Sequence, residues 1–372
     1  MELFFDLVYV LAVTQLSHLL LQHLDVQGAA QTALLVVAVW AAWIYNAWFT
    51  NWFDPDRRVV RLVLFGVMLA SLLMSATLPQ AFGDRGLVFA GAYVAMQVGR
   101  TVFVVAALGE EPGLRRNFQR ILAWLLGSGV LWLAGGLAHD RARAALWLAA
   151  VLVDLVAPVW GFYTPGLGRS RTTDWTITGG HMAERCQLFV IIALGESILV
   201  TGATFERLPF ATATVAAFVA AFLGSVALWW VYFDRSAEAA SRVIASSADP
   251  GRLGRSAYTY CHVVMVAGII VAAVGDELVI THPSGHADAA TIATVLGGPA
   301  LFLVGHGLFK RAVFGVLSGQ RLVAVLALAA LAPVGLVAPP LLLVSAATLV
   351  VAGVAGWDSR MLRADLPAPA TT

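Results

Sequence analysis

The chain has 372 residues, of which 60% are hydrophobic and only 12% are charged, and its formal net charge is +1. A composition with so few charged side chains excludes a soluble globular protein, because such a chain could not cover its surface with polar groups. Apolar runs of about 20 residues recur from end to end, so the sequence predicts an all-α polytopic membrane protein.

We expect about twelve transmembrane helices, and the segments between them are too short to form a separate extramembrane domain. An even number of spans places both termini on the same side of the membrane. The expected spans are residues 3–22, 29–50, 62–81, 86–108, 118–137, 144–163, 186–205, 210–232, 256–278, 290–309, 321–337 and 339–356.

Basic residues are distributed unevenly between alternate connecting segments. If the first helix enters from the cytoplasm, the outer segments hold only Arg85, Arg141, Arg143 and Arg207, and Arg100 lies within a span. The remaining Arg and Lys residues fall on the inner side, as the positive-inside rule requires. We therefore expect cytoplasmic termini (N-in and C-in). The frequent Arg and Ala with a single Lys are typical of a GC-rich bacterial genome, so we expect the bacterial cytoplasmic, or inner, membrane.

The first expected helix carries acidic residues at helical spacing. Glu2, Asp6 and Tyr9 lie at positions i, i+4 and i+7, so they share one face. A face with two acids is too costly to present to lipid, so we expect it to point into the protein.

An aromatic cluster from Trp43 to Phe53 ends the second expected helix and is followed by a charged segment. The pattern is typical of aromatic side chains at the membrane–water interface. Asn46 lies within the cluster, where a buried amide would need partners.

Two ionisable residues lie within later spans of the first half. Arg100 is about two turns from the inner boundary, where it can partly reach the interface or pair with Asp6 or Glu196. Asp154 precedes Pro158 by one turn, and proline both frees a backbone carbonyl and can kink the helix. An acid beside a kink is a candidate binding residue.

The segment 181–197 is the most informative part of the sequence. It places Glu184 and Arg185 at the mouth of an apolar run and Glu196 in the middle of that run. A carboxylate there is expensive, so we expect Glu196 to face protein or water. Its role is either functional or that of a hydrogen-bond anchor between helices. His181 and Glu184 share a helical face but make too small a set to predict a metal site.

Short segments of the first half recur in order in the second half. The matches are 43–45 with 230–232, 54–57 with 249–252, 83–84 with 275–276, 98–103 with 304–309, and 119–120 with 320–321. We predict two parallel six-helix repeats with a site between them. The repeats contribute Arg100 and His306 from their fourth helices.

The expected organisation is a first repeat over residues 1–163, a cytoplasmic connecting loop over 164–185, a second repeat over 186–356 and a cytoplasmic tail over 357–372. The candidate substrate- or ion-binding residues are Glu2, Asp6, Arg100, Asp154, Glu184, Arg185, Glu196 and His306. We predict no catalytic residues, cofactor, metal or nucleic-acid partner, because motifs for phosphate binding, zinc proteolysis and serine hydrolysis are absent.

Two long motifs resemble those of the bacterial low temperature requirement protein A family. They are residues 2–17, ELFFDLVYVLAVTQLS, and residues 181–197, with the pattern HxxERxxLFxIIxLGES; 78–83 and 154–158 agree as well. The resemblance implies an integral membrane protein linked to growth in the cold. Family members usually have more residues before the first helix, whereas this sequence begins at Met1 and Glu2, which leaves open whether an N-terminal segment is missing. Phe5 and Asp6 also resemble, more weakly, the first helix of endolysosomal potassium channels.

Three functions fit the sequence. The first is a secondary transporter or channel for a small solute or ion, protons included, and the duplication and intramembrane charges favour it. The second is an intramembrane enzyme that modifies a lipid or isoprenoid, which would need paired carboxylates near a lipid-accessible cleft. The third is a non-catalytic protein that responds to the state of the bilayer and has no aligned polar path.

Overall fold

The protein is helical throughout the part that the structure, a computed structural model, describes: residues 1–108 and 112–364. This range contains no β-strand. The long helices are α1 (Glu2–Gln22), α2 (Val26–Trp52), α3 (Arg58–Thr77), α4 (Gly86–Ala107), α5 (Pro112–Leu137), α6 (Asp140–Val159), α7 (Gly179–Glu206), α8 (Thr212–Phe233), α11 (His262–Thr281), α12 (Ala289–Phe314), α13 (Gly319–Gly335) and α14 (Pro340–Ala364). The short ones are η1 (Leu78–Gln80), η2 (Thr172–Asp174), α9 (Ser236–Ala245), α10 (Pro250–Leu253) and the π-helix η3 (Gly254–Cys261).

Eleven helices in the described ranges are long and apolar enough to cross a membrane, and α13 is a shorter apolar helix of 17 residues. The polytopic all-α fold predicted from the sequence is confirmed. Two details differ from the expectation. The segment 164–185 is not all loop, because α7 begins at Gly179, and the expected tail begins inside α14. Residues 365–372 of that tail lie outside the described residues.

The chain divides into two compact units, which we describe separately. The first unit comprises Met1–Arg185 and Ile244–Arg255, and the second comprises Cys186–Val243 and Ser256–Thr372. Helix α7 contributes its first residues, as far as Arg185, to the first unit and the remainder to the second.

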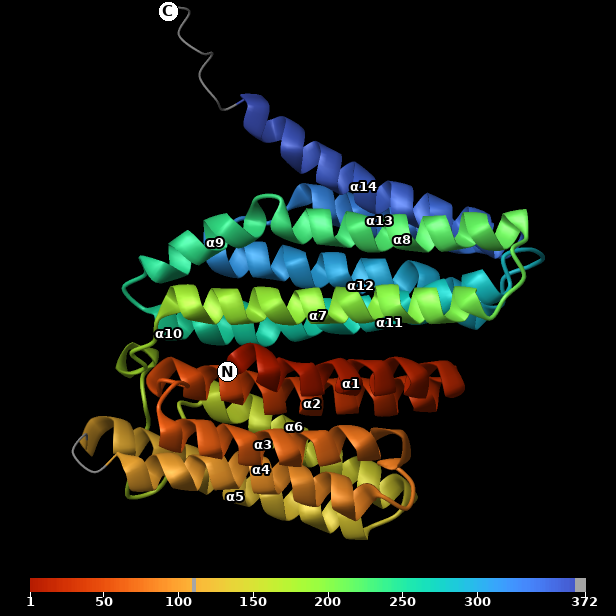
Figure 1. The fold of residues 1–372 in the computed structure, drawn as a ribbon. Helices are drawn as coiled ribbons and strands as arrows, with labels where there is room; N and C mark the ends of the chain where they lie inside the picture. Colours follow the sequence, from red (N-terminus) through yellow and green to blue (C-terminus); the bar gives the residue numbers. More distant parts are fainter. Residues whose placement is uncertain (109–111, 365–372) are drawn as a thin grey trace, which may run out of the picture. The chain divides into compact units, whose positions relative to one another are not determined.

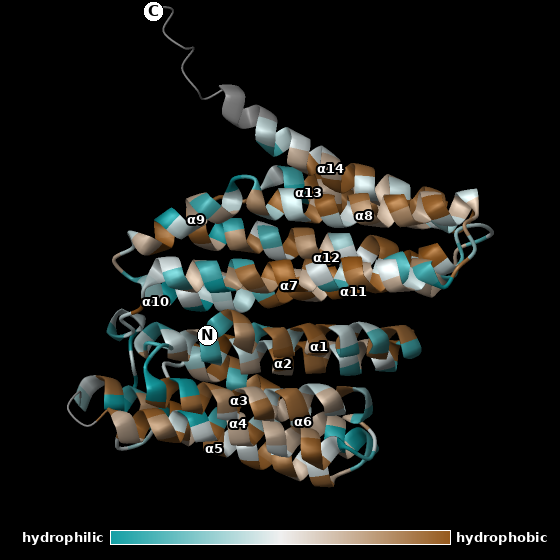
Figure 2. Ribbon diagram, in the orientation of Figure 1, coloured by the Kyte–Doolittle hydropathy of each residue, from teal (hydrophilic) through white to brown (hydrophobic). Residues whose placement is uncertain are grey.

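In the first unit, α1 to α6 pack side by side (Figure 1). Helix α3 has one buried and one exposed apolar face: Leu64 is fully buried, whereas Leu62 and Leu69 are more than half exposed. Figure 2 shows similar apolar stretches along the other helices. A surface of large apolar side chains over an interior that holds charged groups is the arrangement expected in lipid.

Arg143 has a different place from the one predicted. It belongs to α6 and is only 3% exposed, rather than lying in an outer loop. Its guanidinium donates to the carbonyl oxygens of Ala81 (2.9 Å) and Ala138 (3.0 Å). The residue thus satisfies backbone groups at the ends of neighbouring helices, where no helical partner is available.

In the second unit, α8 and α11 to α14 form the packed core. Helices α11 and α12 approach closely because glycines face the opposite backbone. A Cβ added to Gly298 would lie 2.4 Å from the Ala272 nitrogen, and one added to Gly268 would lie 2.4 Å from the Phe302 nitrogen. The predicted repeat matches Asp276 with Asp84. Asp276 lies inside α11, whereas Asp84 lies in the turn between η1 and α4.

Candidate functional site

Asp6 and Arg185 form a buried ion pair in the first unit. Arg185 Nη1 lies 2.6 Å from Asp6 Oδ2, and Arg185 Nη2 lies 2.8 Å from Asp6 Oδ1. Trp43 Nε1 donates to Asp6 Oδ1 at 2.9 Å, and the Arg185 guanidinium lies 5.5 Å from the centre of the Trp43 ring. The carboxylate therefore accepts three charge-assisted or indole hydrogen bonds where almost no water reaches it.

A second pair lies one helical turn towards the start of both helices. His181 Nε2 is 3.0 Å from Glu2 Oε2, and Arg185 Nε is 3.5 Å from Glu2 Oε1. Both Glu2 and His181 are partly exposed, with side-chain exposures of 19% and 25%.

The arrangement follows from helical spacing. Glu2 and Asp6 are four residues apart on α1, and His181 and Arg185 are four residues apart on α7, so each pair shares a face. Two acids thus face two bases, one pair buried and one partly exposed. We call Glu2, Asp6, His181 and Arg185 the polar ladder.

Arg100 lies apart from the ladder acids. Asp6 is paired with Arg185 instead, so the predicted pairing of Arg100 with Asp6 is wrong. The packing of α1 against the start of α7 places the Arg185 guanidinium beside the Asp6 carboxylate. Arg100 is 3% exposed and donates through Nη2 to Gln97 Oε1. Its guanidinium lies 5.8 Å from the centre of the Tyr45 ring, within range of a cation–π interaction. The pairing of Arg100 with Glu196 stays a prediction.

Asp154 on α6 is 7% exposed and is held by neutral donors. The Tyr93 hydroxyl donates to its Oδ2 at 3.0 Å, and Trp132 Nε1 donates to the same oxygen at 3.2 Å. Gln97 Nε2 donates to the Tyr93 oxygen at 3.4 Å. A chain of side-chain hydrogen bonds therefore runs from Asp154 through Tyr93 and Gln97 to Arg100.

Glu184 does not join these groups. It is exposed on α7, whereas Arg185 beside it is buried. Within the described ranges, no set of three or more His, Cys, Asp or Glu side chains is placed to hold a metal ion.

In the second unit, Glu196 is 3% exposed on α7, and the hydroxyl oxygen of its neighbour Ser197 lies 3.3 Å from that of Ser225. His306 is fully buried on α12. Its Nδ1 accepts from Arg321 Nε at 3.3 Å, and Arg321 Nη1 donates to Asp358 Oδ1 at 2.9 Å.

Another buried histidine of this unit, His262, lies within hydrogen-bond distance of a tyrosine. The Tyr232 hydroxyl oxygen is 2.8 Å from His262 Nε2, and the Tyr232 and His306 ring centres are 6.2 Å apart. In the first unit, Arg100 likewise lies beside Tyr45. The residues matched between the halves of the sequence therefore have similar neighbours within each unit.

Several of these hydrogen-bond partners were not predicted from the sequence. Trp43 was interpreted as part of an interfacial aromatic cluster, but it is fully buried and bonds Asp6. Tyr93, Gln97 and Trp132 carry no local signal beyond a polar or aromatic side chain in an apolar run. Arg321 was assigned to the inner side, yet it is 2% exposed and bonds His306.

The fold and these side chains define a multi-pass helical membrane protein with several ionisable side chains buried within its helices. The sequence model of the family described as bacterial low temperature requirement A protein (LtrA) matches residues 1–356. The chain belongs to this family, and the resemblance stated from its motifs is confirmed.

One curated relative is an uncharacterized protein, RA0937, of Rhizobium meliloti (strain 1021). The two sequences are 39% identical over 313 residues, which is 83% of this chain and 76% of the relative. No solved structure matches the chain.

Proposed function

We propose that the protein is a secondary transporter or channel for a small ion in the bacterial cytoplasmic membrane, and that the polar ladder binds a proton that it transports or couples to transport. The observation that carries the proposal is the opposed pairing of Glu2 with His181 and Asp6 with Arg185 within membrane-spanning helices. Ionisable groups inside a membrane are costly, and transport pathways are a common reason for keeping them.

The two pairs are suited to different tasks. Asp6 and Arg185 are both almost fully buried, and their bidentate bonds keep two opposite charges inside the protein. Glu2 and His181 are partly exposed, and carboxylate and imidazole side chains inside membranes commonly form proton relays. A proton taken up by the Glu2–His181 pair changes the charge beside Arg185, which also lies close to Glu2.

Three further observations support transport. The side-chain chain from Asp154 to Arg100 gives the first unit a second buried polar track. The similar neighbours of Arg100 and His306 favour the predicted internal repeat, which is common among transporters. A lipid-modifying enzyme would need carboxylates available to its substrate, whereas both ladder acids are held by basic side chains.

The test is proton flux in vesicles that contain the purified protein. An inside-negative potassium diffusion potential is imposed with valinomycin, and a pH-sensitive dye inside the vesicles reports acidification. We expect acidification with the wild-type protein and at least about a tenfold slower rate with Glu2→Gln or His181→Gln, because each removes a proton-exchanging group.

Asp56→Asn is the matched control, since Asp56 is an exposed acid outside the ladder, with 77% side-chain exposure. It should acidify the vesicles at the wild-type rate. Wild-type vesicles that acidify no faster than empty ones, or a Glu2→Gln protein as fast as wild type, would contradict the proposal.

A further inference from the structure

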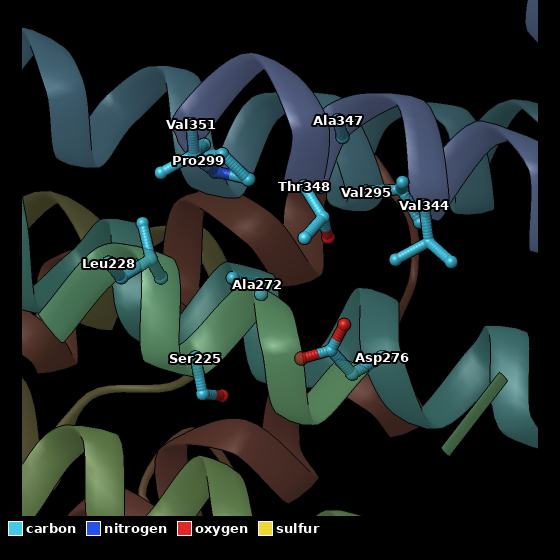
Figure 3. A pocket seen from close by; sticks show the side chains of 11 residues that line it. Ser225, Leu228, Ala272, Asp276, Val295, Pro299, Val344, Ala347, Thr348 and Val351 are labelled. Carbon is cyan, nitrogen blue, oxygen red and sulfur yellow. The ribbon is translucent and has the colours of Figure 1, made fainter. Parts of the chain in front are cut away.

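A small cavity in the second unit is lined by residues of α8, α11, α12 and α14 (Figure 3). Its volume is about 20 Å³, which is room for one particle the size of a water molecule. Small residues create this room: Gly224 and Ala272 are in the wall, and a Cβ on Gly224 would lie 3.2 Å from Thr348 Oγ1.

The carboxyl group of Asp276 lines this cavity and has no bonding partner among the described residues. Asp276 is 8% exposed, and no hydrogen bond or ion pair joins it to another residue within the described ranges. By contrast, Asp6 and Asp154 each accept from at least two donors. A buried carboxylate without a partner must gain a counter-charge or a proton.

Two residues of the wall offer further oxygens, the Thr348 hydroxyl and the Val295 carbonyl. Thr348 points towards Asp276 across the cavity in Figure 3, and its hydroxyl likewise has no hydrogen-bond partner among the described residues. Pro299 lacks an N–H, so the carbonyl of Val295, one turn earlier on α12, loses its helical partner. Both Val295 and Pro299 line the cavity.

These oxygens match the ligands that a hard cation prefers. Alkali and alkaline-earth ions bind carboxylates, hydroxyls and backbone carbonyls. Carbonyls freed from interrupted membrane helices hold sodium ions or protons in transporters. Asp276 and Thr348 do not bond each other directly, so a particle placed between them can bond both.

We propose that this cavity is a binding site for one small monovalent cation, Na⁺ or a proton, held by the carboxyl group of Asp276. Thr348 and the Val295 carbonyl supply the remaining oxygens. Asp276 is the one titratable residue among the eleven described residues of the cavity wall, so no other wall residue competes for the charge. The site is independent of the polar ladder, and its test measures occupancy rather than flux.

The experiment is thermal unfolding of the purified full-length protein in detergent, with choline, K⁺ or Na⁺ as the sole cation. A ligand that binds only the folded state raises Tm in proportion to the logarithm of its concentration above Kd. If Na⁺ is the occupant, it raises the Tm of the wild type and not that of Asp276→Asn. Glu277→Gln, which removes the adjacent acid outside the cavity, should respond like the wild type.

The second arm varies pH in choline alone. If a proton is the occupant, Na⁺ has no effect, and raising the pH lowers the Tm of the wild type more than that of Asp276→Asn, because only the wild type loses the proton bound at Asp276. The proposal is overturned if wild type and Asp276→Asn respond identically to both Na⁺ and pH.

Two gentler variants keep the proposal testable if Asp276→Asn fails to fold. Thr348→Val removes one oxygen with little change in volume, and Gly224→Ala narrows the cavity beside Thr348. If Na⁺ is the occupant, each should raise the Na⁺ concentration needed for half of the Tm shift by about tenfold or more, the equivalent of one lost ligand. If a proton is the occupant, each should move the midpoint of the pH response. Wild-type midpoints in both variants would contradict a cation in this cavity.

Discussion

Asp6 on α1 and Arg185 on α7 are 179 residues apart in the sequence and form a bidentate, almost fully buried ion pair in the first unit. Such a pair does not by itself make a protein more stable, because an apolar pair of similar volume often stabilises the fold as well or better. Removing one partner, however, leaves an uncompensated buried charge and costs about 3–5 kcal/mol. The pair therefore constrains the first unit strongly while contributing little net stability.

The environment of Asp154 predicts a difference between two substitutions. Asp154→Asn keeps an oxygen that accepts from Tyr93 and Trp132, so we expect nearly wild-type stability. Asp154→Leu leaves both donors unsatisfied in the interior, at a cost of about 1–3 kcal/mol for each. Thermal unfolding followed by tryptophan fluorescence measures both, and equal Tm values for the two variants would contradict this interpretation of the site.

Adjacent glycines on α12 predict opposite responses to alanine. Gly298→Ala places a Cβ 2.4 Å from the Ala272 nitrogen, so α11 and α12 must separate, and we expect a loss of about 1–3 kcal/mol. Gly297→Ala meets nothing within 4 Å and should be neutral or slightly stabilising, since alanine favours the helix. The measurement is the unfolding free energy of each purified variant. Equal losses of unfolding free energy in the two variants would show that the close approach of α11 and α12 does not determine which residue is tolerated at position 298.

The sequence predicts the helices and the inward face of α1 because both depend on local spacing. Asp6 and Tyr9 are buried as expected from their i, i+3 positions. Arg185 was among the candidate residues, but its partner was not predicted, because the register between α1 and α7 depends on tertiary packing. The same reason explains why Trp43 was placed at the interface: an aromatic side chain near a helix end gives no indication of the neighbour it will bond.

Asp276 shows a different limit of sequence-based prediction. It was noticed only as half of a weak match with Asp84, although it is a buried acid within a span. Its place beside Thr348 and Pro299 requires the packing of three helices, α11, α14 and α12, which no local pattern predicts.

Asp288 predicts a local dependence on pH outside the membrane. Its side chain caps α12, and hydrogen bonds from the Thr291 hydroxyl and backbone N–H lower its pKa below the ordinary value. The cap therefore contributes above the unfolded-state pKa, which is about 3.9, and is lost as the pH falls through the lower folded-state value. We expect Asp288→Ala to weaken the first turn of α12 by about 1 kcal/mol near neutral pH.

Amide hydrogen exchange in that turn is the measurement for Asp288. The difference between wild type and Asp288→Ala, compared after correction for intrinsic exchange, should shrink once the pH falls below about 4. A difference that is the same at acidic and neutral pH would mean that the ionised carboxylate is not the capping group.

The predicted topology is tested by labelling single cysteines in intact cells. Ala248 and Ser284 are exposed, and the two native cysteines are buried and can be replaced. The positive-inside distribution predicts that an impermeant maleimide labels Ser284→Cys but not Ala248→Cys until the cells are opened. The reverse pattern would invert the orientation.

The central claim is that the polar ladder moves charge rather than bracing the helices, and proton flux through the Asp6→Asn/Arg185→Gln double variant tests it most directly. The two amides can still bond each other, so the double variant should unfold closer to wild type than either single variant does. If the ladder is the ion site, this folded protein should acidify vesicles at less than about a tenth of the wild-type rate, because the buried charges have been removed. A folded double variant with wild-type flux would contradict the claim and make the ladder a structural anchor.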